Sequence, residues 1–192
     1  ALDHAVERVY LPQHHPLIDA ACLEAIKLLV GNLAASRATD DAGLVARGQC
    51  QVGAWYSVFG WPNVRVGLSH IIGHQLGGRF GVPHGYTSCI TMPAVIRFAG
   101  RWAGDRFAAI ARALELGGAD TEAAEAVAGT IERLVAELRL PARLRDVGVP
   151  EDGLGGLVDA AAHELAATEH RGGHVAPGAT RDDVDRLVHA IW

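Results

Sequence analysis

Residues 67–85 read Gly67-Leu-Ser-His-Ile-Ile-Gly-His-Gln-Leu-Gly-Gly-Arg-Phe-Gly-Val-Pro-His-Gly85, which places three histidines in a short segment. His70 and His74 are four residues apart, so on a helix they lie on one face, one turn from each other. His84 follows a glycine-rich break and comes directly after Pro83. A helix that presents two imidazoles and a loop that returns a third can form a metal site with an open coordination position.

The spacing of the histidines leaves two arrangements open. His70 and His74 could both bind one metal, or one could bind it while the other lines the pocket as a proton carrier, because the unperturbed pKa of histidine is about 6.5. The alternative without a ligand is a pair of packed, hydrogen-bonded histidines on an amphipathic helix. The nearby glycines, which allow close backbone approach, and Pro83, which stiffens the position of the next side chain, favour a ligand site.

Outside this segment the sequence predicts an all-α fold. Alanine, leucine and valine recur at helical spacing along almost the whole chain, and no clean strand-like alternation is present. Residues 1–192 are expected to form a single helical domain, with a break at Gly60–Asn63, a short turn near residues 142–146 and an irregular segment at residues 170–178. Helices are predicted over residues 1–10, 16–36, 40–59, 66–77, 84–98, 105–116, 120–138, 150–167 and 180–191.

The composition excludes several classes of function. The chain has 192 residues, 49% of them hydrophobic and 20% charged, with a formal net charge of −5, so no basic footprint for nucleic acid is present. No apolar run is long enough to span a bilayer, and the first residues lack the layout of a signal peptide. Three cysteines without metal-motif spacing are expected to be free thiols, which indicates a cytoplasmic protein.

Two motifs together resemble the iron-containing alcohol dehydrogenase family. His70-Ile-Ile-Gly-His74-Gln-Leu-Gly-Gly78, followed by Val82-Pro-His84-Gly85, is similar to the family signature, and Ala1-Leu-Asp-His4-Ala-Val-Glu7 is similar to its other metal-binding segment. The resemblance covers essentially the whole chain and implies the helical C-terminal domain of that family, a dehydroquinate synthase-like fold. Two further segments look most like the maleylacetate reductase branch: residues 143–150 and residues 180–192.

The resemblance also implies a chemistry. His4, His70 and His84 would bind a divalent metal, Fe²⁺ or Zn²⁺, and His74 would line the substrate pocket and relay protons. The family reaction is hydride transfer between NAD(H) or NADP(H) and a small alcohol or carbonyl compound, with the metal acting as a Lewis acid. Maleylacetate reductases instead reduce a carbon–carbon double bond in a dicarboxylate, and that branch is generally regarded as not needing the metal.

The sequence departs from the family pattern in two ways. The aspartate ligand of the family would fall one position before Ala1, and Asp3 is not a simple substitute because adjacent helical residues point about 100° apart. The N-terminal nucleotide-binding domain is absent from this sequence, which has no glycine-rich turn after a strand. We therefore expect NAD(P) to bind only together with such a domain or chain, and the isolated chain to be inactive. A homodimer is the default expectation.

Two other classes of function remain open at this point. The chain could be a stand-alone metal- or ligand-binding module without redox activity, or a non-redox enzyme that uses the histidine pocket for acid–base or hydrolytic chemistry. A nucleotide-binding domain discriminates between these hypotheses, since only hydride transfer requires it.

Overall fold

The computed structural model describes residues 1–60 and 65–192, and within these ranges it contains helices and turns but no strand. The α-helices are α1 (Leu2–Tyr10), α2 (Pro16–Asn32), α3 (Asp41–Val58), α4 (Leu68–Phe80), α5 (His84–Ala99), α6 (Gly104–Ala113), α7 (Ala123–Glu137), α8 (Leu154–His170) and α9 (Arg181–Ala190). Short 3₁₀ turns are η1 (Ala35–Arg37), η2 (Asp120–Glu122), η3 (Leu144–Val147) and η4 (Glu151–Gly153). The predicted all-α fold class is confirmed.

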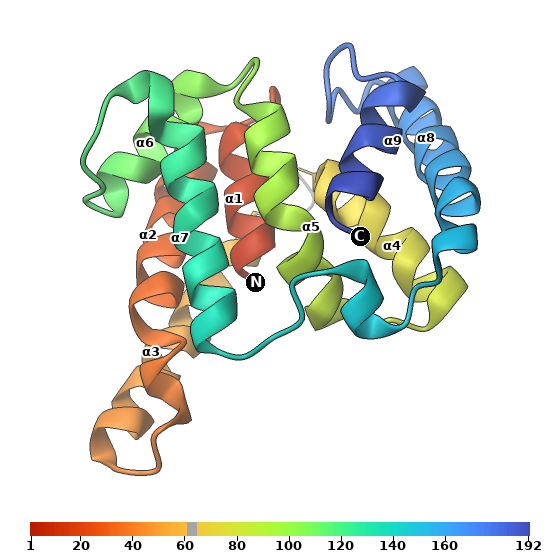
Figure 1. Cartoon of the computed structure of the whole chain (residues 1–192). Helices are drawn as coiled ribbons and strands as arrows, with labels where there is room; N and C mark the ends of the chain where they lie inside the picture. Colours follow the sequence, from red (N-terminus) through yellow and green to blue (C-terminus); the bar gives the residue numbers. More distant parts are fainter. Residues whose placement is uncertain (61–64) are drawn as a thin grey trace.

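Helix α5 lies in the middle of the molecule (Figure 1). On one side of it, α1, α2, α3, α6 and α7 pack together, with α7 and α1 next to α5; on the other side lie α4, α8 and α9. The three elements that bear the motif histidines, α1, α4 and α5, therefore meet near the centre. None of the helices in the described ranges is both long enough and apolar enough to cross a membrane.

Several helices begin at side chains that cap them. Pro16 opens α2, and the side chain of His15 before it accepts a hydrogen bond from the backbone N–H of Leu17. Asp40 caps α3 in the same way. At α9 the side chains of Thr180 and Asp183 each accept from the backbone N–H of the other, so the capping box is present.

The helix ends were harder to predict. The predicted helix over residues 16–36 ends at Asn32, and residues 35–37 form the separate turn η1. Helix α4 continues past the glycine pair to Phe80, because the left-handed residue that ends it is Gly81, with φ of +67°. Helix α8 extends to His170, which shortens the expected irregular segment. The predicted break at Gly60–Asn63 lies, apart from Gly60, outside the described residues.

Of the helices that carry the motif histidines, α1 is the best buried. Ala5, Val6 and Val9 have no exposed surface. Arg8, also fully buried, donates hydrogen bonds of 2.8 Å to the carbonyls of Ser57 and Phe59 and so satisfies the end of α3.

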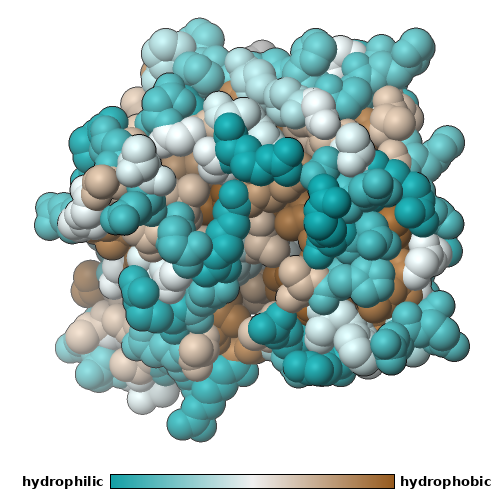
Figure 2. Space-filling view, turned by 45° about the horizontal axis from the view of Figure 1, so that its top comes forward, coloured by the Kyte–Doolittle hydropathy of each residue, from teal (hydrophilic) through white to brown (hydrophobic). Residues whose placement is uncertain are grey.

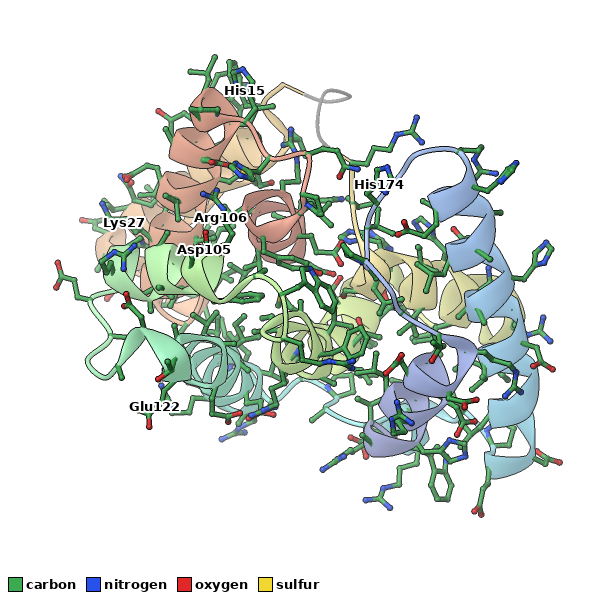
Figure 3. The ribbon with its side chains drawn as sticks, turned by 90° about the horizontal axis from the view of Figure 1, so that it is seen from above. His15, Lys27, Asp105, Arg106, Glu122 and His174 are labelled. Carbon is green, nitrogen blue, oxygen red and sulfur yellow. The ribbon has the colours of Figure 1, made fainter. Side chains whose placement is uncertain are left out.

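Arg106 on α6 also contacts the helices near the N-terminus, and its side chain points toward α2 (Figure 3). It donates to the Val9 carbonyl at 2.8 Å and to Asp19 at 2.5 Å. These contacts hold α1 in a fixed position within the bundle.

Candidate metal centre

The structure brings His4, His70 and His84 together. One ring nitrogen of each lies within 4.8 Å of the others. The rings of His4 and His70 stack with centroids 4.5 Å apart and an interplanar angle of 22°, and the His70 and His84 centroids are 5.8 Å apart. His70 is buried, His4 is half-buried and His84 is exposed. The cluster therefore has a closed side at His70 and an open side at His84.

Each of the three histidines lies in the first turn of its helix. Helix α1 begins at Leu2, two residues before His4, and α4 begins at Leu68, two residues before His70. His84 is the first residue of α5, and Pro83 is the N-cap of that helix. Helix N-termini carry partial positive charge, which disfavours an additional proton on a nearby imidazole. The three helix starts thus converge on one point.

The pKa values of two of the rings, those of His4 and His84, are lowered. Burial, together with the neighbouring His70, lowers the pKa of His4 to about 3. Burial and the charges of His70 and His74 also lower the pKa of His84. A neutral imidazole has a free lone pair, which is the form that binds a metal.

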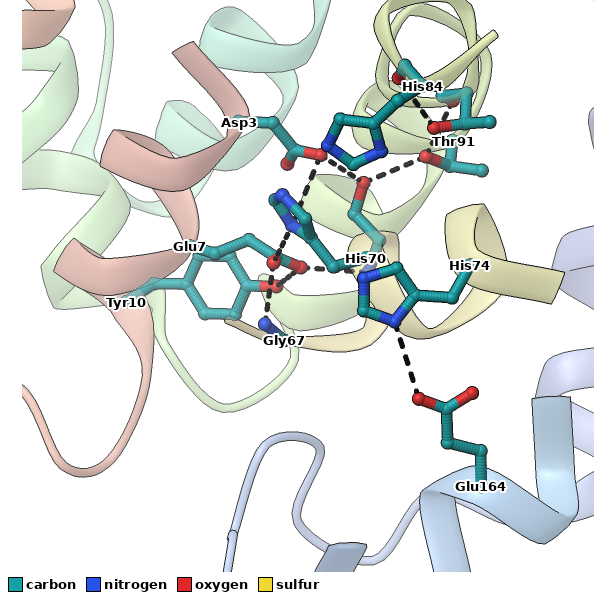
Figure 4. A network of polar contacts seen from close by, with 11 residues as sticks. Asp3, Glu7, Tyr10, Gly67, His70, His74, His84, Thr91 and Glu164 are labelled. Carbon is teal, nitrogen blue, oxygen red and sulfur yellow. Dashed lines mark hydrogen bonds and ion pairs between the residues drawn. The ribbon is translucent and has the colours of Figure 1, made fainter. Parts of the chain in front are cut away.

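His70 contacts carboxylates on its other side. Its Nδ1 lies 2.6 Å from Oε2 of Glu7 and 3.5 Å from Oδ2 of Asp3 (Figure 4). Burial alone would lower the pKa of His70, but the hydrogen bond to Glu7 and the charges of Asp3 and Glu7 raise it. Both carboxylates are almost fully buried. His70 is therefore oriented by acidic groups that lie on the side of the ring opposite Nε2.

Asp3 belongs to a buried polar chain that crosses from α1 to α5. The hydroxyl of Ser69 lies 2.8 Å from Oδ2 of Asp3 and 2.8 Å from Oγ1 of Thr91. Thr91 in turn donates to the carbonyl of Thr87 at 2.9 Å. Burial and the charge of Glu7 raise the pKa of Asp3 to about 6.

His74 lies beside the cluster rather than within it. Its ring centroid is 6.2 Å from that of His70 and 6.5 Å from that of His84. The side chain is half exposed, and its Nδ1 lies 3.4 Å from Oε1 of Glu164 on α8. His74 thus borders the open side of the cluster next to the exposed His84.

The histidine cluster lines a cavity of about 160 Å³ between α1, α5 and α7. Cys89 and Val135 line both this cavity and a larger one of about 760 Å³ between α5, α7 and α9. Figure 2 shows a molecular face with a hollow near its middle, where apolar side chains lie between hydrophilic ones. The site therefore adjoins space for a ligand with an apolar part.

Sequence reasoning missed the carboxylates around His70 and His74. Glu7 was visible as an acidic residue three positions after His4, one turn along the same helix face, but its role depends on a contact with a residue 63 positions away. Glu164 on α8 gave no sequence signal. Asp3 was weighed only as a replacement for a missing ligand, and it instead lies on the Nδ1 side of His70.

The donor set fits a divalent transition metal. Three imidazoles, two of them with lowered pKa values, converge with one side open, and a hydrogen-bonded carboxylate supports the buried ring. Histidine nitrogen donors suit Fe²⁺ and Zn²⁺ alike, and three protein ligands leave room for a substrate oxygen. The arrangement can therefore hold a metal and present it to a small molecule.

Comparison with known proteins identifies the family of the chain. The profile of the Fe-containing alcohol dehydrogenase family, C-terminal, matches residues 1–192. Lactaldehyde reductase of Escherichia coli (strain K12) is 32% identical over 196 aligned positions, which cover 100% of this chain and 49% of that protein. Maleylacetate reductase of Pseudomonas sp. (strain P51) is 35% identical over 100 positions, 51% of this chain and 28% of that protein.

Solved structures agree with this result. A crystal structure of 1,3-propanediol oxidoreductase superposes with a TM-score of 0.88 at 26% identity and covers 100% of this chain and 49% of that one. The chain thus spans about half the length of the relatives it matches. The expected resemblance to both alcohol dehydrogenases and maleylacetate reductases is confirmed: the chain belongs to the Fe-containing alcohol dehydrogenase family and corresponds to the C-terminal part of its members.

Proposed function

We propose that His4, His70 and His84 bind one divalent metal ion, Fe²⁺ or Zn²⁺, and that residues 1–192 act as the metal- and substrate-binding domain of an NAD(P)-dependent oxidoreductase. The observation that carries the proposal is the convergence of three imidazole nitrogens within 4.8 Å of one another at the starts of three helices. Family membership supports it, since similar proteins include reductases and dehydrogenases.

The bound metal would supply Lewis-acid polarisation of a substrate oxygen. The residues of the chain would bind the metal, orient the ligand rings and leave room for the substrate. Burial keeps His4 neutral and ready to bind, while Glu7 fixes the orientation of His70. The exposed His84 leaves the substrate side open, and the adjoining cavity of about 760 Å³ accommodates the apolar part of a substrate.

His74 is the residue we assign to proton transfer. It lies next to the open side of the cluster, half exposed, so it can exchange protons with solvent, and the contact with Glu164 orients its ring. In alcohol oxidation it would accept the proton that leaves the substrate hydroxyl, and in carbonyl reduction it would return that proton to the substrate oxygen. His74 would not itself be a metal ligand.

Hydride transfer requires a nucleotide-binding domain in addition to residues 1–192. We propose that such a domain binds NAD(P) and completes the cleft over the histidine cluster. The substrate would be a small alcohol or carbonyl compound, or an unsaturated dicarboxylate as in the maleylacetate reductase relatives. A cytoplasmic homodimer is the expected form, and the three free cysteines are compatible with that location.

The test is metal binding by the purified chain. After treatment with a chelator and reloading under anaerobic conditions with Fe²⁺ or with Zn²⁺, elemental analysis should find about one metal per chain, and His4→Ala, His70→Ala and His84→Ala should each reduce this content strongly. His163→Ala, a change to a histidine on α8 outside the cluster, serves as the control. Undiminished metal content in all three cluster variants would contradict the proposal.

A further inference from the structure

Glu7 joins the two helices that carry His4 and His70. Its Oε2 accepts a hydrogen bond from the backbone N–H of Gly67 at 2.5 Å, and its Oε1 accepts one from the backbone N–H of Ser69 at 2.8 Å. The hydroxyl of Tyr10 donates to the same Oε1 at 3.3 Å. Gly67 is the N-cap of α4 and has no side chain to satisfy these donors, so a residue of α1 caps α4 instead.

These contacts determine the direction of the hydrogen bond to His70. Backbone N–H groups can only donate, so Gly67 and Ser69 fix both oxygens of Glu7 as acceptors. A Glu7 carboxylate has no proton to donate, so the contact of 2.6 Å between its Oε2 and His70 Nδ1 places a proton on Nδ1. In a neutral imidazole the lone pair is then on Nε2, the nitrogen that points away from the carboxylate.

We infer that Glu7 is a positioning residue that sets both the tautomer and the rotation of the His70 ring, so that Nε2 is presented to the metal. This inference rests on the proposed metal centre and deepens it. Glu7 is 1% exposed, so its hydrogen bonds do not compete with water. One side chain thereby caps α4, aligns a ligand on α4 and lies one helical turn from the ligand His4 on α1.

The first test reads the tautomer directly in the unmodified chain. Long-range ¹H–¹⁵N correlation spectra of the chelator-treated protein, with His70 assigned through a His70→Gln variant and the pH raised until this ring is neutral, should show a protonated Nδ1 and an unprotonated Nε2. After loading with Zn²⁺, only the Nε2 resonance should shift strongly. A neutral ring with its proton on Nε2 would overturn the inference, and this readout does not require any Glu7 variant to fold.

The second test is Glu7→Gln, with Tyr10→Phe as its matched control. Glutamine has one acceptor oxygen where the carboxylate has two, so its NH₂ group must face either Ser69 or the pair Gly67 and His70. We expect Glu7→Gln to weaken Zn²⁺ binding by about 10- to 100-fold. Tyr10→Phe removes one hydrogen bond to Glu7 but keeps the carboxylate. Because that bond is long, at 3.3 Å, and therefore weak, the Zn²⁺ affinity should change by less than about 3-fold.

The two tests separate the inference from the proposed function. If the wild-type chain binds no Zn²⁺ but shows the Nδ1–H tautomer at His70, the metal centre is wrong while the orienting role of Glu7 stands. If Zn²⁺ binds and Glu7→Gln has the affinity of wild type, the positioning role is wrong and the metal centre stands. If Glu7 only stabilised the fold, Glu7→Gln would lower the thermal midpoint of the metal-free protein but leave the Zn²⁺ affinity of the folded protein unchanged. That result would also count against the inference.

Discussion

The rings of His4 and His70 stack with centroids 4.5 Å apart although they belong to helices separated by most of the first third of the chain. This contact depends on the packing of α1 against the start of α4, and the position of His84 depends likewise on the packing of α4 against α5. The geometry of the candidate metal centre is therefore a property of these two helix interfaces, and changes at either interface should affect it.

Among the glycines of α4, Gly73 leaves the least room for a side chain. A Cβ atom at this position would lie 2.9 Å from Oγ1 and 3.2 Å from Cβ of Thr87, which is buried and donates to the carbonyl of His84. Gly73→Ala should push α4 away from α5, lower the free energy of unfolding by about 1–3 kcal/mol and weaken metal binding.

Gly78 is the matched control on the same helix. A Cβ atom there would meet nothing within 4 Å, so Gly78→Ala should raise the free energy of unfolding by up to about 1 kcal/mol through helix propensity. Urea unfolding of both variants in the presence of a chelator measures the difference. Equal free energies of unfolding for the two alanine variants would show that the α4–α5 contact has room for a methyl group at residue 73.

His74→Ala should separate proton transfer from metal binding. The ring borders the cluster but is half exposed and contacts Glu164, so its removal should leave the metal content close to that of wild type. If a nucleotide-binding domain completes the enzyme as we propose, turnover should fall by about 100-fold or more, as for the loss of a general acid–base group. Loss of the metal from this variant would instead identify His74 as a ligand.

Asp183 should make stability depend on pH. Hydrogen bonds from the backbone and side chain of Thr180, and then the Arg101 guanidinium, lower the pKa of Asp183 in the folded state. A carboxylate with a lowered native pKa stabilises the fold above its unfolded value of about 3.9, and this contribution is lost as the pH falls through the native value.

Asp183→Asn should therefore lower the free energy of unfolding by about 1 kcal/mol between pH 6 and 8 and by progressively less below about pH 4. Asp185→Asn, a substitution on the same helix at a more exposed side chain, is the control. Chemical unfolding at several pH values measures both. A deficit for Asp183→Asn that stays constant down to pH 3 would contradict the assigned role of the carboxylate.

The elements of this fold were largely predictable because they depend on local signals. Pro16, Asp40 and the Thr180–Asp183 box mark helix starts by chemistry that acts within three residues. Helix ends depend on which residue adopts a left-handed conformation, and the sequence offered several glycines after His74. Only the structure identifies Gly81 as that residue.

The site could be predicted only in part. The spacing of His70 and His84 and the resemblance of the first residues to a metal-binding segment indicated three ligands, and the fold brings these together. The contacts of His70 with Glu7 and of His74 with Glu164 join residues that are 63 and 90 positions apart. Such contacts follow from how whole helices pack, which no local pattern encodes.

The most direct measurement is a crystal structure of the metal-loaded chain with anomalous data collected at the absorption edge of the metal. We expect a single anomalous peak about 2.1 Å from one nitrogen each of His4, His70 and His84, with Nε2 as the contacting atom of His70. A metal bound elsewhere, or one coordinated by His74 in place of any of these three histidines, would contradict the proposed metal centre.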